Sequence, residues 1–136
     1  MGTWQVGPFD NDVAMDFFDE VEDTPDAQVL PRLREVLVAV LERPGQVELD
    51  EGRIAVAAAS LVAAARSRSG ATGNPSVDAW LAVHRPQATA EDRRVALAAL
   101  DRVVGPDSEW LALWATSPSG SAAEERVESL RKMLAG

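Results

Sequence analysis

The sequence predicts an all-α fold, a compact bundle of six to seven helices with an ordered extended segment at its N-terminus. Apolar residues make up 46% of the 136 residues, and most are Ala, Val or Leu, a composition that favours helices over strands. Apolar positions recur at spacings of three and four, and no segment alternates apolar and polar residues for the length of a strand. No linker divides the chain, so we expect one helical domain over residues 1–136.

The charge balance narrows the classes of partner. The chain has 22 acidic and 13 basic residues, a net charge of −9, which disfavours nucleic-acid binding and favours a basic protein or a cation. It has no cysteine, which excludes disulfides and thiolate chemistry. The opening lacks the basic region of a signal peptide, and the longest apolar stretch, residues 54–65, is far shorter than the roughly 20 residues that span a bilayer. We expect a cytoplasmic protein that does not enter a membrane.

The first nine residues show no helical period, and we expect them to form an ordered extended segment. Four of the seven Phe and Trp residues, namely Trp4, Phe9, Phe17 and Phe18, lie in the first eighteen positions. Burying such rings stabilises a fold by roughly 2–3 kcal/mol each. The segment is therefore predicted to pack onto the domain, with Trp4 and Phe9 inserted into the bundle. A Trp4→Ala variant that melts at the wild-type temperature would contradict this.

Helix N-caps and apolar stripes predict the first three helices. The first begins near Asp10–Asp12, buries Ala14, Phe17, Phe18 and Val21, and ends at Thr24–Asp26, where the second begins. The second carries Leu30, Leu33, Leu37, Val40 and Leu41, stops at Pro44-Gly45, and contains Pro31, which either begins its main body or kinks it. The third, capped by Asp50 and ending near Arg66, is apolar on all sides except Ser60, so we expect it at the centre of the fold.

The second half of the chain predicts four shorter helices. Asn74-Pro75 begins one that carries Val77, Trp80 and Leu81, and Arg85-Pro86 ends it. Thr89 caps the next, whose inward residues are Val95, Ala96, Ala99, Leu100 and Val103. Asp107 or Ser108 begins a helix in which Trp110, Leu113 and Trp114 share a face, which we assign to the core. After a loop over 116–120, Ser121–Glu124 matches a capping box and opens a helix that buries Val127, Leu130 and Leu134.

Two sets of residues suggest chemistry, each with a structural alternative. His84, the single histidine, precludes a multi-histidine metal site and is interpreted as a half-exposed residue near a helix end. Asp10, Asn11, Asp12 and Asp16 offer oxygen ligands suited to Mg²⁺ or Ca²⁺. Met15 and Val21 stand where a calcium loop needs its glycine and closing glutamate, which excludes an EF-hand. The favoured alternative is that Asp10–Asp12 cap the first helix while Asp16 faces water.

An acidic run covers the first helix and its flanks. Residues 10–26 contain eight acidic and no basic side chains, including Asp16, Asp19, Glu20, Glu22 and Asp23. Such a run is either a solvated helix face or a docking surface for a basic protein, because complementary charge steers association.

The opening also carries a recognisable pattern. Met1–Ala14 contains a Gly-x-Trp motif and the block Gly7-Pro8-Phe9-Asp10-Asn11-Asp12, followed by Asp16-Phe17. This pattern resembles the bacterial domain-of-unknown-function family DUF4259, and Asp107–Glu109 with Leu111 and Trp114 resembles its C-terminal half. The resemblance implies an α-helical bacterial domain, often actinobacterial, without an established activity, so it transfers no catalytic residue. The signature residues are Trp4, Gly7, Phe9, Asp10, Asn11, Asp12 and Phe17.

Three functional hypotheses follow from these observations. The leading one is a non-enzymatic interaction protein, for example an immunity- or antitoxin-like inhibitor, that binds a basic partner through its acidic face and needs no cofactor. The alternative is a divalent-metal or small-ligand-binding domain, in one form hydrolytic, centred on Asp10, Asp12, Asp16 and His84. The third is a homodimer, which requires an apolar surface patch left after folding.

Overall fold

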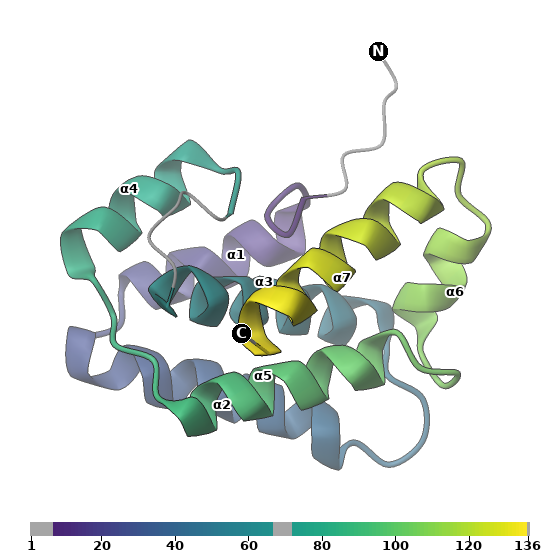
Figure 1. Cartoon of the computed structure of the whole chain (residues 1–136), viewed down its shortest axis with the longest axis horizontal. Coiled ribbons are helices and arrows are strands. Elements are labelled where there is room, and N and C mark those ends of the chain that lie inside the picture. The colour runs from purple at the N-terminus through teal and green to yellow at the C-terminus, as the bar shows by residue number, and fades with distance from the viewer. Residues whose placement is uncertain (1–6, 67–71, 136) are drawn as a thin grey trace.

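Seven helices account for the regular structure of the part of the chain that the computed structural model describes, residues 7–66 and 72–135 (Figure 1). They are α1 (Asp12–Glu22), α2 (Asp26–Glu42), α3 (Leu49–Arg66), α4 (Pro75–His84), α5 (Ala90–Val103), α6 (Glu109–Ala115) and α7 (Gly120–Ala135). These residues contain no strand, only an isolated bridge between Val47 and Ser108. The all-α prediction is confirmed. Trp4, predicted to insert into the bundle, lies outside the described residues.

The central position predicted for α3 is confirmed. The helix contacts α1, α2, α5, α6 and α7, and its residues from Ala55 to Ala64 are buried. Most of these buried residues are alanine, whose small side chain allows neighbouring helices to approach a helix backbone closely. Figure 1 shows α3 behind α7, with α2 and α5 along one side, α6 at one end and α4 at the other.

A close approach at one end of α3 explains the glycine within its first turns. A Cβ atom on Gly52 would lie 2.7 Å from the Cβ of Trp110 in α6. Glycine removes this overlap and lets the buried Trp110 side chain rest on the helix backbone. The Val47 N–H donates to the Asp107 carbonyl and the Glu109 N–H donates to the Val47 carbonyl, at 2.9 Å each, which joins α6 to the segment before α3.

Most of the predicted helix starts are confirmed by their caps. Asn11 caps α1, Asn74 caps α4, Thr89 caps α5 and Ser108 caps α6, each with a side-chain oxygen that accepts backbone N–H groups. At the end of α4, Arg85 adopts a left-handed conformation with φ of 45°. Each capping side chain binds N–H groups within three residues of itself, which is why the sequence alone located the four caps.

Two boundaries differ from the prediction. The helix α7 begins at Gly120, because the Gly120 N–H closes a turn onto the Ser117 carbonyl, so Ser121 lies inside the first turn and is not a cap. The helix α3 begins at Leu49, one residue before the predicted Asp50 cap. The start of α2 at Asp26 agrees with the prediction, and of the two roles left open for Pro31 the structure excludes the first, because α2 passes through Pro31 and does not begin there.

The buried side chains form one continuous cluster drawn from all seven helices. The predicted inward residues of α1, α4 and α7 are buried, except that Leu81 is only half-buried. In α2, Val29 is buried, and the predicted core residues Leu30 and Leu41 are only partly covered. Val95 in α5 is also half-buried, as are Leu113 and Trp114 in α6, whereas Trp110 is buried.

None of the helices in the described ranges combines the length and the apolar character needed to cross a membrane.

Candidate functional site

The opening block Gly7–Asn11 folds into a tight turn that leads into α1. The Gly7 N–H donates to the Asp10 carboxylate at 2.7 Å, and the Asp10 N–H donates back to the Gly7 carbonyl at 3.1 Å. The Asn11 side chain then accepts the Ala14 N–H at 2.8 Å. A Cβ atom on Gly7 would lie 2.5 Å from the Asp10 carboxylate oxygen, so a larger residue there would displace the side chain that accepts the Gly7 N–H. Asp10 and Asn11 thus tie the entering backbone to the helix, as predicted.

Phe9 anchors this turn in the core. Its side chain is 3% exposed, and its ring meets the Phe18 ring edge-on at a centroid distance of 6.0 Å. Phe18 in turn meets Trp80 of α4 edge-on at 5.8 Å. Phe17, another signature residue, is buried as well. The predicted insertion of the N-terminal segment is confirmed for Phe9.

The three aspartates proposed as metal ligands have different surroundings. Asp10 is held by the Gly7 N–H, whereas Asp12 and Asp16 are exposed on α1. Within residues 7–66 and 72–135, no group of three or more His, Asp or Glu side chains is placed to hold a metal ion. The geometry of this part of the chain therefore gives the metal hypothesis no support.

The residues predicted to form an interaction face do share one surface, which we call the α1 acidic surface: Asp16, Asp19, Glu20, Glu22 and Asp23. All five are exposed, because the opposite face of α1 is buried in the core. Glu20 pairs with Arg32 of α2 at 3.2 Å. In the described ranges the other four carboxylates have no ion pair.

The positions of these carboxylates are unfavourable for the helix itself. Asp16 and Glu20, and likewise Asp19 and Asp23, are four residues apart, a spacing at which like charges destabilise a helix by about 0.2–0.5 kcal/mol per pair. Glu22 and Asp23 also lie at the C-terminal end of α1, the negative end of the helix dipole, and the last turn holds no basic residue. The sequence of α1 therefore concentrates negative charge where helix stability alone disfavours it.

Elsewhere in the molecule, basic residues neutralise many of the acidic ones. Ion pairs join Arg43 to Glu48 and Glu51, Arg53 to Asp50, Arg94 to Glu91, and Arg131 to Asp101 and Glu128. Other exposed carboxylates also lack ion pairs, but on α1 four of them lie on one face of a short helix, which makes this face the strongest candidate for a functional surface.

His84 lies at the end of α4, half-exposed as predicted, with a partner that the sequence did not reveal. Its Nδ1 atom is 2.7 Å from a carboxylate oxygen of Asp26 at the start of α2. Its ring stacks on Trp80 at a centroid distance of 4.8 Å and an interplanar angle of 25°. His84 therefore fastens α4 to α2, and it is not gathered with Asp10, Asp12 or Asp16 into a metal group.

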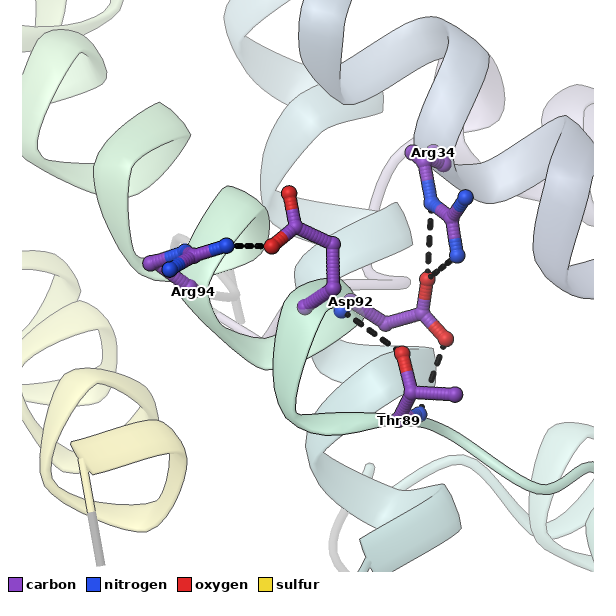
Figure 2. A network of polar contacts seen from close by, with 5 residues as sticks. Arg34, Thr89, Asp92 and Arg94 are labelled. Carbon is purple, nitrogen blue, oxygen red and sulfur yellow. Dashed lines mark hydrogen bonds and ion pairs between the residues drawn. The ribbon is translucent and has the colours of Figure 1, made fainter.

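A second polar contact missed by the sequence joins α2 to α5 (Figure 2). Asp92 is 3% exposed, and its carboxylate accepts from Nε of Arg34 at 2.9 Å and from the Thr89 N–H at 2.9 Å. The Asp92 N–H donates to the Thr89 hydroxyl at 3.1 Å. Burial raises the pKa of Asp92, but the hydrogen bonds from Thr89 and Arg34 outweigh it and hold that pKa below its usual value. Because these groups satisfy Asp92, it stabilises the fold and is not available for a ligand.

One of these contacts had a local signal. Thr89 and Asp92 have the spacing of a capping box, so the hydrogen bonds between these two residues could have been predicted from the sequence. The pairs Arg34–Asp92 and Asp26–His84 each join residues 58 apart, and no local pattern indicates which distant residues meet.

The comparisons with known proteins agree with the pattern of the opening residues. No curated protein and no solved structure matches the chain. The model of a family described as a domain of unknown function, DUF4259, matches residues 2–126, which include the signature turn, the α1 acidic surface and all helices up to the first half of α7. The chain therefore belongs to the DUF4259 family.

Proposed function

We propose that this chain is a non-enzymatic protein-interaction domain that binds a basic partner through the α1 acidic surface. The supporting observation is the group of carboxylates that lack a cationic neighbour at positions where the helix dipole and like-charge repulsion oppose them. Local conflicts of this kind are expected at functional surfaces. A cationic partner would remove the conflict on binding.

The charge of the chain defines the class of partner. A net charge of −9 repels nucleic acids and anionic membranes and accelerates encounters with a positively charged protein. An immunity- or antitoxin-like inhibitor that covers the active site of a basic enzyme is a concrete form of this function. Binding of this kind weakens as salt rises, because the steering field is screened within about 10 Å at 0.1 M ionic strength.

The test compares two variants with the same change in net charge. In the α1-neutralised variant, the substitutions are Asp16→Asn, Asp19→Asn, Glu22→Gln and Asp23→Asn. In the control-neutralised variant, they are Asp107→Asn, Glu109→Gln, Glu124→Gln and Glu125→Gln, at exposed carboxylates that also lack ion pairs in the described chain. Each immobilised protein is incubated with an extract of the native host, and the retained proteins are quantified by mass spectrometry.

We expect the wild type and the control-neutralised variant to retain the same basic protein. The α1-neutralised variant should retain it about tenfold less, which corresponds to a loss of about 1.4 kcal/mol in binding. Equal retention by all three proteins, or no protein retained by any of them, would contradict the proposal.

A further inference from the structure

The outer face of α4 is exposed and, apart from Ser76, carries apolar side chains. Val77 and Trp80 face the core, whereas Ala79, Ala82 and Val83 are exposed on other sides of the helix. Val83 is 77% exposed, more than any other large hydrophobic residue in the described ranges. An isolated exposed valine is ordinary, so its significance depends on what surrounds it.

The helix α4 lies beside α1, and the two helices run in the same direction (Figure 1). At its start, the Asn74 side-chain amide approaches the Met15 sulfur at 3.7 Å. In its middle, Trp80 meets Phe18, and at its end His84 meets Asp26, four residues beyond the end of α1. The first two contacts fix which edges of α1 and α4 are neighbours, and the third joins the end of α4 to the start of α2.

The edge of α1 that faces α4 carries part of the acidic surface. Met15, Asp19 and Glu22 recur at i, i+4 and i+7, so they lie in one line along α1, and Met15 contacts the start of α4. On α4, Val83 is three residues after Trp80 and shares the side of the helix on which Trp80 meets α1. Helix geometry therefore places Val83 and the line Asp19–Glu22 on the same side of the contact between α4 and α1.

We propose that the outer face of α4 and the Asp19–Glu22 edge of α1 together dock an amphipathic helix of a partner protein, with basic residues along one border of its apolar stripe. This inference rests on the proposed function and specifies the partner. Such a helix places its apolar residues on Ala79, Ala82 and Val83 and its lysines or arginines beside Asp19 and Glu22. A second copy of this chain is disfavoured as the occupant, because its net charge of −9 would repel the same surface.

The test uses a synthetic 18-residue peptide of leucine and lysine with an amphipathic helical period. A scrambled peptide of the same composition is the control for charge alone. Binding to the isotope-labelled full chain is followed by NMR chemical-shift changes, which also show whether each variant stays folded. The variants are Val83→Asp, its control Ala112→Asp at an exposed position of α6, and the double variant Asp19→Asn with Glu22→Gln.

The Val83→Asp variant distinguishes apolar docking from charge attraction, because the two predict opposite changes in peptide affinity. Apolar docking predicts at least tenfold weaker binding of the amphipathic peptide, because a carboxylate must enter the apolar contact. Attraction by charge alone predicts unchanged or tighter binding, because the variant adds a negative charge. We expect weaker binding for Val83→Asp and for the double variant, wild-type binding for Ala112→Asp, and at least tenfold weaker binding of the scrambled peptide.

Three outcomes would overturn the inference. If the double variant loses binding while Val83→Asp does not, the acidic surface acts alone, and the proposed function stands without this inference. If neither variant changes binding, both the inference and the proposed function fall. If the chain alone forms a dimer in sedimentation and Val83→Asp dissociates it, a second copy occupies this face.

Discussion

At the scale of single residues, Asp92 shows how a charged group is kept inside the bundle. Its carboxylate is buried, yet it accepts hydrogen bonds from Arg34 and from the Thr89 N–H (Figure 2). Removing one partner of a buried charged contact leaves the other without compensation, which is more destabilising than the contact itself is stabilising. The Asp92 carboxylate therefore joins the N-cap of α5 to α2.

We predict that Asp92→Asn lowers the free energy of unfolding by about 1.5–3 kcal/mol at neutral pH, the range for hydrogen bonds to charged groups. The folded-state pKa of Asp92 is lowered, so its stabilising effect is complete above the unfolded pKa of about 3.9 and is lost as pH falls through the folded value. Urea unfolding between pH 3 and pH 7 checks this. The difference between wild type and variant should shrink in acid, and a constant difference would contradict the assignment.

A second prediction concerns Ser60, the polar side chain in the apolar stretch of α3. Its hydroxyl is fully buried and has no hydrogen-bond partner among the described residues. An unpaired buried hydroxyl costs about 1–3 kcal/mol, and alanine is the better helix former. Ser60→Ala should therefore raise the free energy of unfolding by about 0.5–1.5 kcal/mol in urea titrations. A loss of stability would mean that the hydroxyl is satisfied.

Residue roles set by neighbours in the sequence were predictable, and those set by distant neighbours were not. Asn11, Asn74 and Thr89 were assigned as caps because each acts on N–H groups within three positions. The partner of His84 could not be assigned, because Asp26 meets it only after α2 and α4 have packed. The same holds for Arg34 and Asp92.

At the scale of elements, apolar periodicity located all seven helices, but it placed some boundaries and faces imprecisely. The early start of α7 follows from the turn that Gly120 closes onto Ser117, which a capping-box match at Ser121 could not reveal. Val29 is buried in place of Leu30 because the α2 face follows its contacts with α3 and α5. Periodicity gives the apolar stripe of a helix, and packing decides which part of it is covered.

The helix α1 gives a prediction about its own contribution to the stability of the fold. We predict that Asp23→Asn raises the free energy of unfolding by about 0.3–1 kcal/mol, because it removes a negative charge from the negative end of the helix dipole and relieves repulsion with Asp19. The matched control is Glu109→Gln, which removes an acidic residue from the first turn of α6 and should lower stability. Thermal melts at low ionic strength measure both, and effects of equal sign would contradict this account.

At the scale of the whole molecule, two features coexist: a continuous core shared by seven helices and an uneven distribution of surface charge. The core supplies stability through burial, so the surface of α1 can carry unfavourable charge without loss of the fold. The sequence predicted the sign and place of this charge from the acidic run. It could not predict that arginines elsewhere pair with many of the other carboxylates, because that depends on how the helices pack.

This distribution predicts how salt affects the stability of the whole chain. Raising the ionic strength from about 0.01 M to about 0.15 M shortens the screening length from about 30 Å to about 8 Å. Repulsion among the α1 carboxylates and across the negative surface weakens, whereas ion pairs with atoms closer than 4 Å lie within the screening length at both salt concentrations. The melting temperature of the wild type should therefore rise with salt.

The two neutralised variants locate the origin of that rise. Both remove four negative charges, so a dependence on net charge alone predicts the same reduced salt effect in each. Repulsion concentrated on α1 predicts a smaller rise in the α1-neutralised variant than in the control-neutralised variant. The α1 carboxylates repel one another along one helix, whereas the acidic neighbour of Glu124 and Glu125 on α7, Glu128, is paired with Arg131. Calorimetric melts at the two salt concentrations measure this difference. Equal slopes would assign the repulsion to the overall charge of the molecule and remove the stability conflict on which the proposed function of α1 rests.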